Sequence, residues 1–150
     1  MRIVIQRVSS AAVSIDGATV GAIGNGVMVL VGVEVGDTID DVKWLAAKTV
    51  ALRIFDDDAG VMNRSVADVG GNVLAVSQFT LTASTRKGNR PGYTRAAGHD
   101  LAVPLYEAYC AEVSKALGRP VERGRVGADM QVSLVNDGPV TLIIDSRLRE

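Results

Sequence analysis

Seven consecutive residues without a charged side chain, VMVLVGV from Val27 to Val33, set the first limit on the fold. A strand with one face in water alternates apolar and polar side chains, whereas an unbroken apolar run is typical of a strand covered on both faces. The run is also far shorter than the ~20 residues that a membrane-spanning helix needs. It therefore predicts a central strand of a sheet.

Five further strands are indicated by runs rich in β-branched residues that stop at turn signals. An Asp-Gly pair separates the first two, and the last two flank the sequence NDGP, which predicts a hairpin between them. The expected strands are Arg2–Ile15, Ala18–Ala22, Val73–Val76, Met130–Val135 and Val140–Asp145.

Two helices are predicted from apolar residues at helical spacing. The first follows Thr38, which forms a capping-box pattern with Asp41, and extends to Arg53. The second ends at Leu117 and starts at about Asp100 or Pro104, because proline is expected only near the first turn. Together these elements predict one α/β domain of the α+β type over residues 1–150, with a bent, mainly antiparallel, barrel-like sheet and two helices.

Composition and charge narrow the class of protein further. The 150 residues are 47% hydrophobic and 22% charged with a formal net charge of −1, which is typical of a globular domain and excludes coating of nucleic acid through overall charge. Neither a membrane span nor a signal peptide is predicted from the sequence, so a cytoplasmic location is expected.

The usual catalytic groups are scarce. One histidine and one cysteine cannot form a zinc site, and the Asp56–Asp58 cluster lacks the glycine and glutamate of a calcium loop, so no metal and no cofactor are expected. We expect a surface or capping role for His99, beside a helix start, and a buried apolar position for Cys110.

Two polar segments are not explained by packing alone. SQFTL, residues 77–81, ends an apolar strand with two hydroxyls, an amide and an aromatic ring, although a plain strand end gives the same pattern. NDGPVT, residues 136–141, reads as a hairpin, yet Gly138 and Pro139 place two carbonyls together with no proline N–H. The turn is therefore mainly a hydrogen-bond acceptor.

Taken with RIFDDDAGVMNRS and KGNRPGY, these two segments closely resemble the D-aminoacyl-tRNA deacylase family, also called D-tyrosyl-tRNA deacylase. The resemblance covers essentially the whole chain, from MRIVIQRV to VTLIID. Gly92 and Tyr93 depart from the Ser and Phe of the family pattern, so no role is assigned to them.

The resemblance implies hydrolysis of the ester between a D-amino acid and the 3′-terminal adenosine of tRNA, and also removal of glycine mischarged on tRNA-Ala. It implies a homodimer with the active site at the dimer interface, where a cis Gly138-Pro139 turn reaches the partner's site and rejects L-amino acids. The 2′-hydroxyl of the tRNA is expected to assist, since an aminoacyl ester is already activated.

The resemblance also suggests roles for individual residues. Arg7 is expected to hold the turn, with an ordinary strand charge as the alternative, and Met130 to line the pocket, with core packing as the alternative. The expected catalytic residues are Ser77, Gln78, Phe79 and Thr80, and the expected phosphate contacts are Arg86, Lys87, Arg90 and Arg95, unless these four cations only solvate a loop.

Three alternatives remain open from the sequence. Thr80 or Ser77 could act as a covalent nucleophile, although no general base accompanies them. The chain could be a non-catalytic RNA-binding dimer of the same fold. A small-molecule esterase is the third reading, which would cleave free aminoacyl esters without tRNA.

Overall fold

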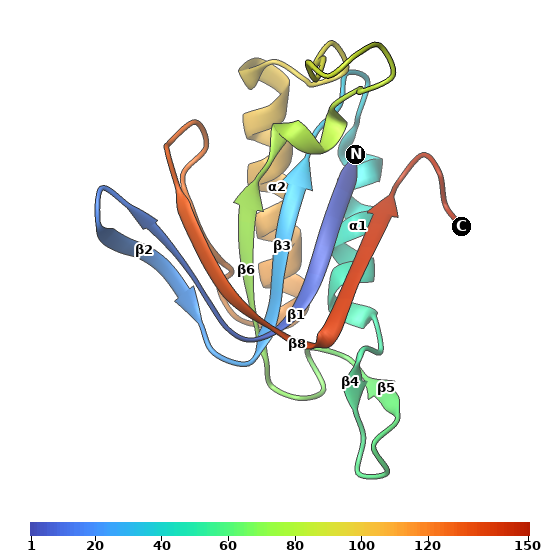
Figure 1. Ribbon diagram of the computed structural model, residues 1–150. Helices are drawn as coiled ribbons and strands as arrows, with labels where there is room; N and C mark the ends of the chain where they lie inside the picture. Colours follow the sequence, from blue (N-terminus) through green and yellow to red (C-terminus); the bar gives the residue numbers. More distant parts are fainter.

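A computed structural model describes residues 1–150 as one sheet covered by two helices (Figure 1). A two-stranded hairpin projects beside it. The elements in chain order are β1 (Arg2–Ile15), β2 (Ala18–Ile23), β3 (Gly26–Gly32), α1 (Ile39–Ala51), β4 (Phe55–Asp56), β5 (Met62–Arg64), β6 (Asn72–Ser77), the 3-10 helix η1 (Phe79–Thr82), α2 (His99–Leu117), β7 (Glu122–Arg123) and β8 (Gln131–Asp145).

Strand β1 organises the sheet because it pairs with three other strands. Its first half pairs with β3, its second half with β2, and β8 runs antiparallel to nearly its whole length. The sheet order is β2-β1-β3-β6-β7, with β6 parallel to both β3 and β7. Figure 1 shows β1, β2 and β8 curving away from the helices. The predicted bent and mainly antiparallel sheet is confirmed.

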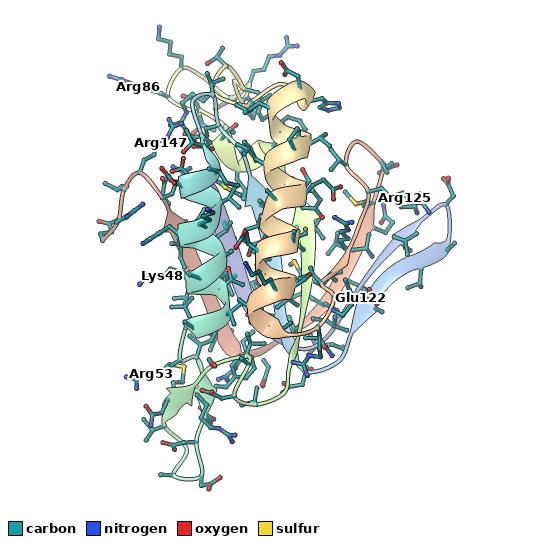
Figure 2. The ribbon with its side chains drawn as sticks, turned by 180° about the vertical axis from the view of Figure 1, so that it is seen from behind. Lys48, Arg53, Arg86, Glu122, Arg125 and Arg147 are labelled. Carbon is teal, nitrogen blue, oxygen red and sulfur yellow. The ribbon has the colours of Figure 1, made fainter.

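The central position of β3 is confirmed by the side chains on its two faces. Val27, Val29 and Val31 belong to the larger core cluster, which includes residues of both helices, whereas Met28 belongs to a smaller cluster with residues of β1, β2 and β6. The two helices lie side by side on one face of the sheet in both views (Figures 1 and 2). The curved strands close over the other face.

The helices begin as their sequences indicate, with one difference. Thr38 caps α1 through the predicted capping box with Asp41. Helix α2 begins at His99 after the N-cap Gly98, so Pro104 lies beyond the first turn rather than within it. Proline has no N–H to bond the carbonyl of Asp100, but the flanking turns continue the helix around this gap. None of the helices is long and apolar enough to cross a membrane.

The predicted hairpin at NDGP is wrong. Both flanking segments belong to the single strand β8 and both pair with β1. Asn136 pairs with Val8 and Thr141 with Gln6, so four residues of β8 face only Arg7 of β1. The segment Asp137–Val140 is therefore a bulge that protrudes from a continuous strand. The sequence also gave no indication of the β4–β5 hairpin, of η1 or of β7.

Candidate active site

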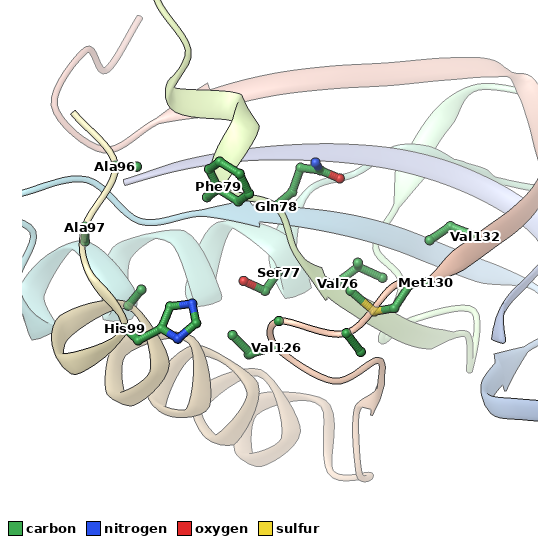
Figure 3. Close-up of a pocket in the computed structure, with 13 residues that line it drawn as sticks. Val76, Ser77, Gln78, Phe79, Ala96, Ala97, His99, Val126, Met130 and Val132 are labelled. Carbon is green, nitrogen blue, oxygen red and sulfur yellow. The ribbon is translucent and has the colours of Figure 1, made fainter. Parts of the chain in front are cut away.

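A cavity of about 480 Å³ opens where β6 ends (Figure 3). Its walls come from the end of β6 and the start of η1, from residues 96–102 at the start of α2, and from residues 126–132 before and within β8. Most of the lining is apolar, and small residues such as Ala97, Ala102 and Gly127 leave the space open. An apolar cavity with a few polar groups is the usual form of a small-molecule site.

The first three residues of the SQFTL segment line this cavity. Ser77 is the last residue of β6, and the backbone N–H of Gln78 donates to the carbonyl of Val31 at 2.7 Å, which extends the sheet by one bond. The chain then turns into η1, and the Thr82 hydroxyl donates to the Phe79 carbonyl at 2.8 Å. The turn passes close to β3 at Gly32, which has no side chain. A Cβ there would lie only 3.1 Å from the Gln78 carbonyl oxygen.

Three of the four predicted catalytic residues line the cavity. Ser77, Gln78 and Phe79 do so. Met130 also lines the cavity, and it packs against the smaller core cluster. Thr80 does not line it. The Gln78 side-chain amide donates to the Thr80 hydroxyl, so the two side chains are held together at the rim.

An exposed aromatic pair borders the cavity. The rings of Phe79 and Tyr93 meet edge to face with centroids 5.0 Å apart, and their side chains are 55% and 40% exposed. Tyr93 belongs to residues 82–98, named the basic loop here because Arg86, Lys87, Arg90 and Arg95 lie in it. Two hydrogen bonds between Ser84 and Gly92 close the tip of this loop.

The four cations of the basic loop differ in their surroundings. Arg86, Lys87 and Arg90 are exposed at the tip, and Figure 2 shows Arg86 projecting from the end of the molecule. Arg95 instead donates to the Thr82 carbonyl at 3.2 Å and lies 4.0 Å from the buried Glu34 carboxylate. Arg95 is therefore held by Thr82 and Glu34, whereas the other three have charges available to a ligand.

Arg7 bonds directly to the bulge of β8. Its Nε donates to the Asp137 carbonyl at 3.0 Å, and its Nη1 donates to the Ile54 carbonyl at 2.7 Å. The Gly138-Pro139 peptide bond is cis, and Gly138 has a φ of +132°. A Cβ there would lie 3.0 Å from Nη2 of Arg7, so a side chain does not fit between the guanidinium and the bulge.

Asn136 closes the base of the bulge. Its side-chain amide donates to the carbonyls of Arg7 and Val140, at 2.9 Å and 3.0 Å, and so spans the two ends of the loop. Gly138 and Pro139 are exposed and do not line the cavity of their own chain. The bulge thus faces outward and is separate from the cavity.

The structure shows where Cys110 and His99 lie, the one cysteine and the one histidine of the chain. Cys110 is buried, as predicted, and burial raises the pKa of its thiol, which disfavours the nucleophilic thiolate. His99 is exposed, but it lines the cavity, and Gly98 rather than His99 occupies the cap position. The capping alternative for His99 is wrong. No group of three or more His, Cys, Asp or Glu side chains is arranged to hold a metal ion.

The fold and the cavity define a small mixed α/β protein with a cavity at the end of a strand. In sequence, the chain matches the family described as D-Tyr-tRNA(Tyr) deacylase over residues 4–145. It is 62% identical to a D-aminoacyl-tRNA deacylase of Opitutus terrae and 57% identical to one of Parabacteroides distasonis, in each case over 100% of both chains.

Solved structures agree with this match. The structure of c-Myc DNA Unwinding Element Binding Protein superimposes with a TM-score of 0.92 at 36% identity, covering 97% of this chain and 98% of that one. A probable eukaryotic D-amino acid tRNA deacylase shares the fold at 17% identity, with a TM-score of 0.82 and coverage of 95% and 97%. The chain belongs to the D-Tyr-tRNA(Tyr) deacylase family, and the predicted enzyme class is confirmed.

Proposed function

We propose that this chain hydrolyses the ester between a D-amino acid and the 3′-terminal adenosine of tRNA, releasing the free D-amino acid and tRNA. The observation that carries this proposal is full-length identity of 57–62% to proteins named D-aminoacyl-tRNA deacylase. The cavity and the basic loop support it, because a nucleoside fits an apolar cavity and three exposed cations suit tRNA phosphates. The site of action is then the cytoplasm, where tRNA is charged.

The chemistry requires little from the protein. An aminoacyl ester is already activated, so an oriented water and donors directed at the developing oxyanion can suffice. Phe79 and Thr80 begin η1, and the first N–H groups of a helix have no partner within it. These N–H groups, with Ser77 and Gln78, hold the adenosine and the ester. The 2′-hydroxyl of the terminal adenosine assists the attack.

We propose that the active form is a homodimer in which the bulge of one chain reaches the cavity of the other. Gly138 and Pro139 are exposed and held outward by Arg7, so they are placed to contact a second molecule. Strand β8 is bonded only to β1 and carries the exposed apolar residues Val132, Val135 and Ile143, which a partner would cover.

In this dimer the bulge selects the substrate by shape. Carbonyls of Gly138 and Pro139 accept hydrogen bonds from the substrate ammonium, whose donors need partners once they leave water. The rigid backbone then leaves room for hydrogen or a D side chain and collides with an L side chain. Glycine passes this filter because it has no side chain, so glycine mischarged on tRNA-Ala is also removed.

A paired time course on D-tyrosyl-tRNA and L-tyrosyl-tRNA tests the reaction and its selectivity. We expect release of the D-amino acid only, and equal release of both would overturn the role of the bulge. Release that persists on tRNA ending in 2′-deoxyadenosine would remove the 2′-hydroxyl from the mechanism. Cleavage of free aminoacyl esters at the same rate would indicate a small-molecule esterase.

A binding function without turnover is the second candidate, because one structural relative carries the name of a DNA-binding protein. Release of D-tyrosine no faster than in buffer, together with retained binding of tRNA, would favour this candidate. A fluorescent DNA duplex in the same binding assay shows whether binding extends to DNA.

A further inference from the structure

We infer that His99 is a substrate-binding residue that contacts the base of the 3′-terminal nucleotide. This inference rests on the proposed function, since it assigns a contact within the cavity that would receive the adenosine. His99 is the only histidine of the chain and the only titratable side chain among the residues that line the cavity.

The position of His99 directs its ring into the cavity. The residue begins α2, directly after the N-cap Gly98, and Figure 3 shows the imidazole projecting from this helix start toward the wall formed by Val126. A Cβ on Gly127 would lie 3.7 Å from Cε1 of His99, so the edge of the ring lies close to Gly127. His99 is exposed, and its ring stands at the mouth of the cavity beside Gly127 and Val126.

The ring nitrogens are available to a ligand. No protein group forms a hydrogen bond with the His99 ring. By contrast, the Tyr106 hydroxyl and the Arg95 guanidinium each donate to a backbone carbonyl. Neutral imidazole offers one donor and one acceptor, and its flat face can stack on a base. The walls next to it are Ala96, Ala97, Ala102 and Gly127, none of which has a polar side chain.

The remaining polar side chains of the cavity lie on a different wall. Ser77 and Gln78 come from the end of β6, where the ester is expected to bind, whereas His99 comes from the start of α2. A nucleotide that places its ester at β6 therefore extends its base toward α2. On this wall His99 is the one side chain that can both stack on a base and hydrogen-bond to it.

The first test uses steady-state kinetics on D-tyrosyl-tRNA. His99→Ala is expected to raise KM by about 5–10-fold, the range for one lost uncharged hydrogen bond with partial loss of stacking, and to leave kcat within about twofold. His99→Gln or His99→Phe, which keep a hydrogen-bonding group or a flat ring, should each recover part of the affinity. Asp100→Asn is the matched control, because Asp100 is the next residue of the same helix turn and does not line the cavity.

The second test uses the fact that a single histidine gives a single Cε1–H resonance in the proton NMR spectrum. Adenosine 5′-monophosphate should shift this resonance saturably, and cytidine 5′-monophosphate at the same concentrations should shift it less. An unchanged KM for His99→Ala, or a fall in kcat with KM unchanged, would overturn the inference.

The two tests separate this inference from the proposed function. If wild-type protein releases D-tyrosine but His99→Ala has a wild-type KM, the contact fails and the deacylase stands. If adenosine 5′-monophosphate shifts the resonance but no D-tyrosine is released, the contact stands and the reaction fails.

Discussion

The guanidinium of Arg7 bonds two chain segments that are far apart in sequence, the carbonyl of Asp137 in β8 and the carbonyl of Ile54 before β4. Its side chain is only 10% exposed and lies between the Asp56 and Asp137 carboxylates, at 3.7 Å and 3.6 Å. One side chain of β1 therefore fixes the bulge that carries Gly138 and Pro139.

Replacement of Arg7 should weaken both the fold and the selection of substrate. Arg7→Ala leaves two carbonyls without their donor, which is expected to cost about 1–3 kcal/mol of unfolding free energy by urea denaturation. It should also reduce the ratio of D-tyrosine to L-tyrosine release, because the bulge loses its support. Arg7→Lys should recover little, because one ammonium group lacks the forked donors that reach both carbonyls. Unchanged selectivity in Arg7→Ala would contradict this role.

The hydroxyls of the SQFTL segment should prove dispensable as nucleophiles. We expect Thr80→Ala and Ser77→Ala each to retain most of the wild-type kcat, since Thr80 does not line the cavity and neither residue has a histidine within bonding distance. Loss of a true nucleophile lowers kcat by about 10⁴-fold or more. Single-turnover release of D-tyrosine measures this directly. A loss of that size in either variant would favour the covalent mechanism.

The tip of the basic loop should contribute affinity without selectivity. Arg86→Ala, Lys87→Ala and Arg90→Ala should each lower kcat/KM and reduce the steepness of its salt dependence, by roughly 0.7–0.9 in the log–log slope per lost phosphate contact. The ratio of D to L release should not change. Arg95→Ala is the contrasting variant, because it should lower thermal stability through its lost bond to Thr82. A salt dependence of kcat/KM equal to that of the wild type in all three variants would show that this loop does not contact tRNA phosphates.

Acid should weaken the connection between β1 and β8 at Asp145. Burial by itself raises the pKa of the Asp145 carboxyl, but hydrogen bonds from the Arg147 backbone N–H and the Arg2 guanidinium outweigh it and hold the pKa below its ordinary value. Because the pKa is lower in the folded than in the unfolded state, the carboxylate stabilises the fold above its unfolded-state pKa. This contribution is lost as the pH falls through the folded-state pKa.

Asp145→Asn tests this connection. The wild type should exceed the variant in unfolding free energy near neutral pH, and the difference should shrink toward zero below about pH 4. A difference that stays constant from neutral to acidic pH would show that Asp145 acts through packing alone.

Elements whose stability is local could be predicted from the sequence. The capping box of Thr38 and Asp41 starts α1 where expected, and the apolar run at Val27–Val33 corresponds to the buried strand β3. The prediction of a hairpin at NDGP was wrong because it depended on contacts far along the chain. Turn-forming residues reverse a chain only if the flanking strands pair with each other, and here both find a better partner in the long strand β1.

The site was only partly predictable for a similar reason. SQFTL and NDGPVT stand out because their polar groups follow apolar strands, and their resemblance to a known family gave them roles. The cavity itself is assembled from segments around residues 77, 97 and 127, and small residues such as Ala97 and Gly127 shape it by what they lack. Small apolar residues do not stand out in a sequence as parts of a cavity. The position of His99 in the cavity depends on the folded arrangement of these segments and could not be predicted from the sequence.

The pairing of β1 with β8 joins two segments that are far apart in sequence, so β1 is synthesised long before its partner β8. Arg2 and Asp145 bond across 143 positions, so one edge of β1 stays bare on the ribosome until residues 131–145 emerge. A bare strand edge pairs readily with other chains, and contacts of this sequence separation form slowly. The segment that seals the nascent sheet also carries Gly138 and Pro139. A chain that stops short of it is therefore both prone to aggregation and without the bulge.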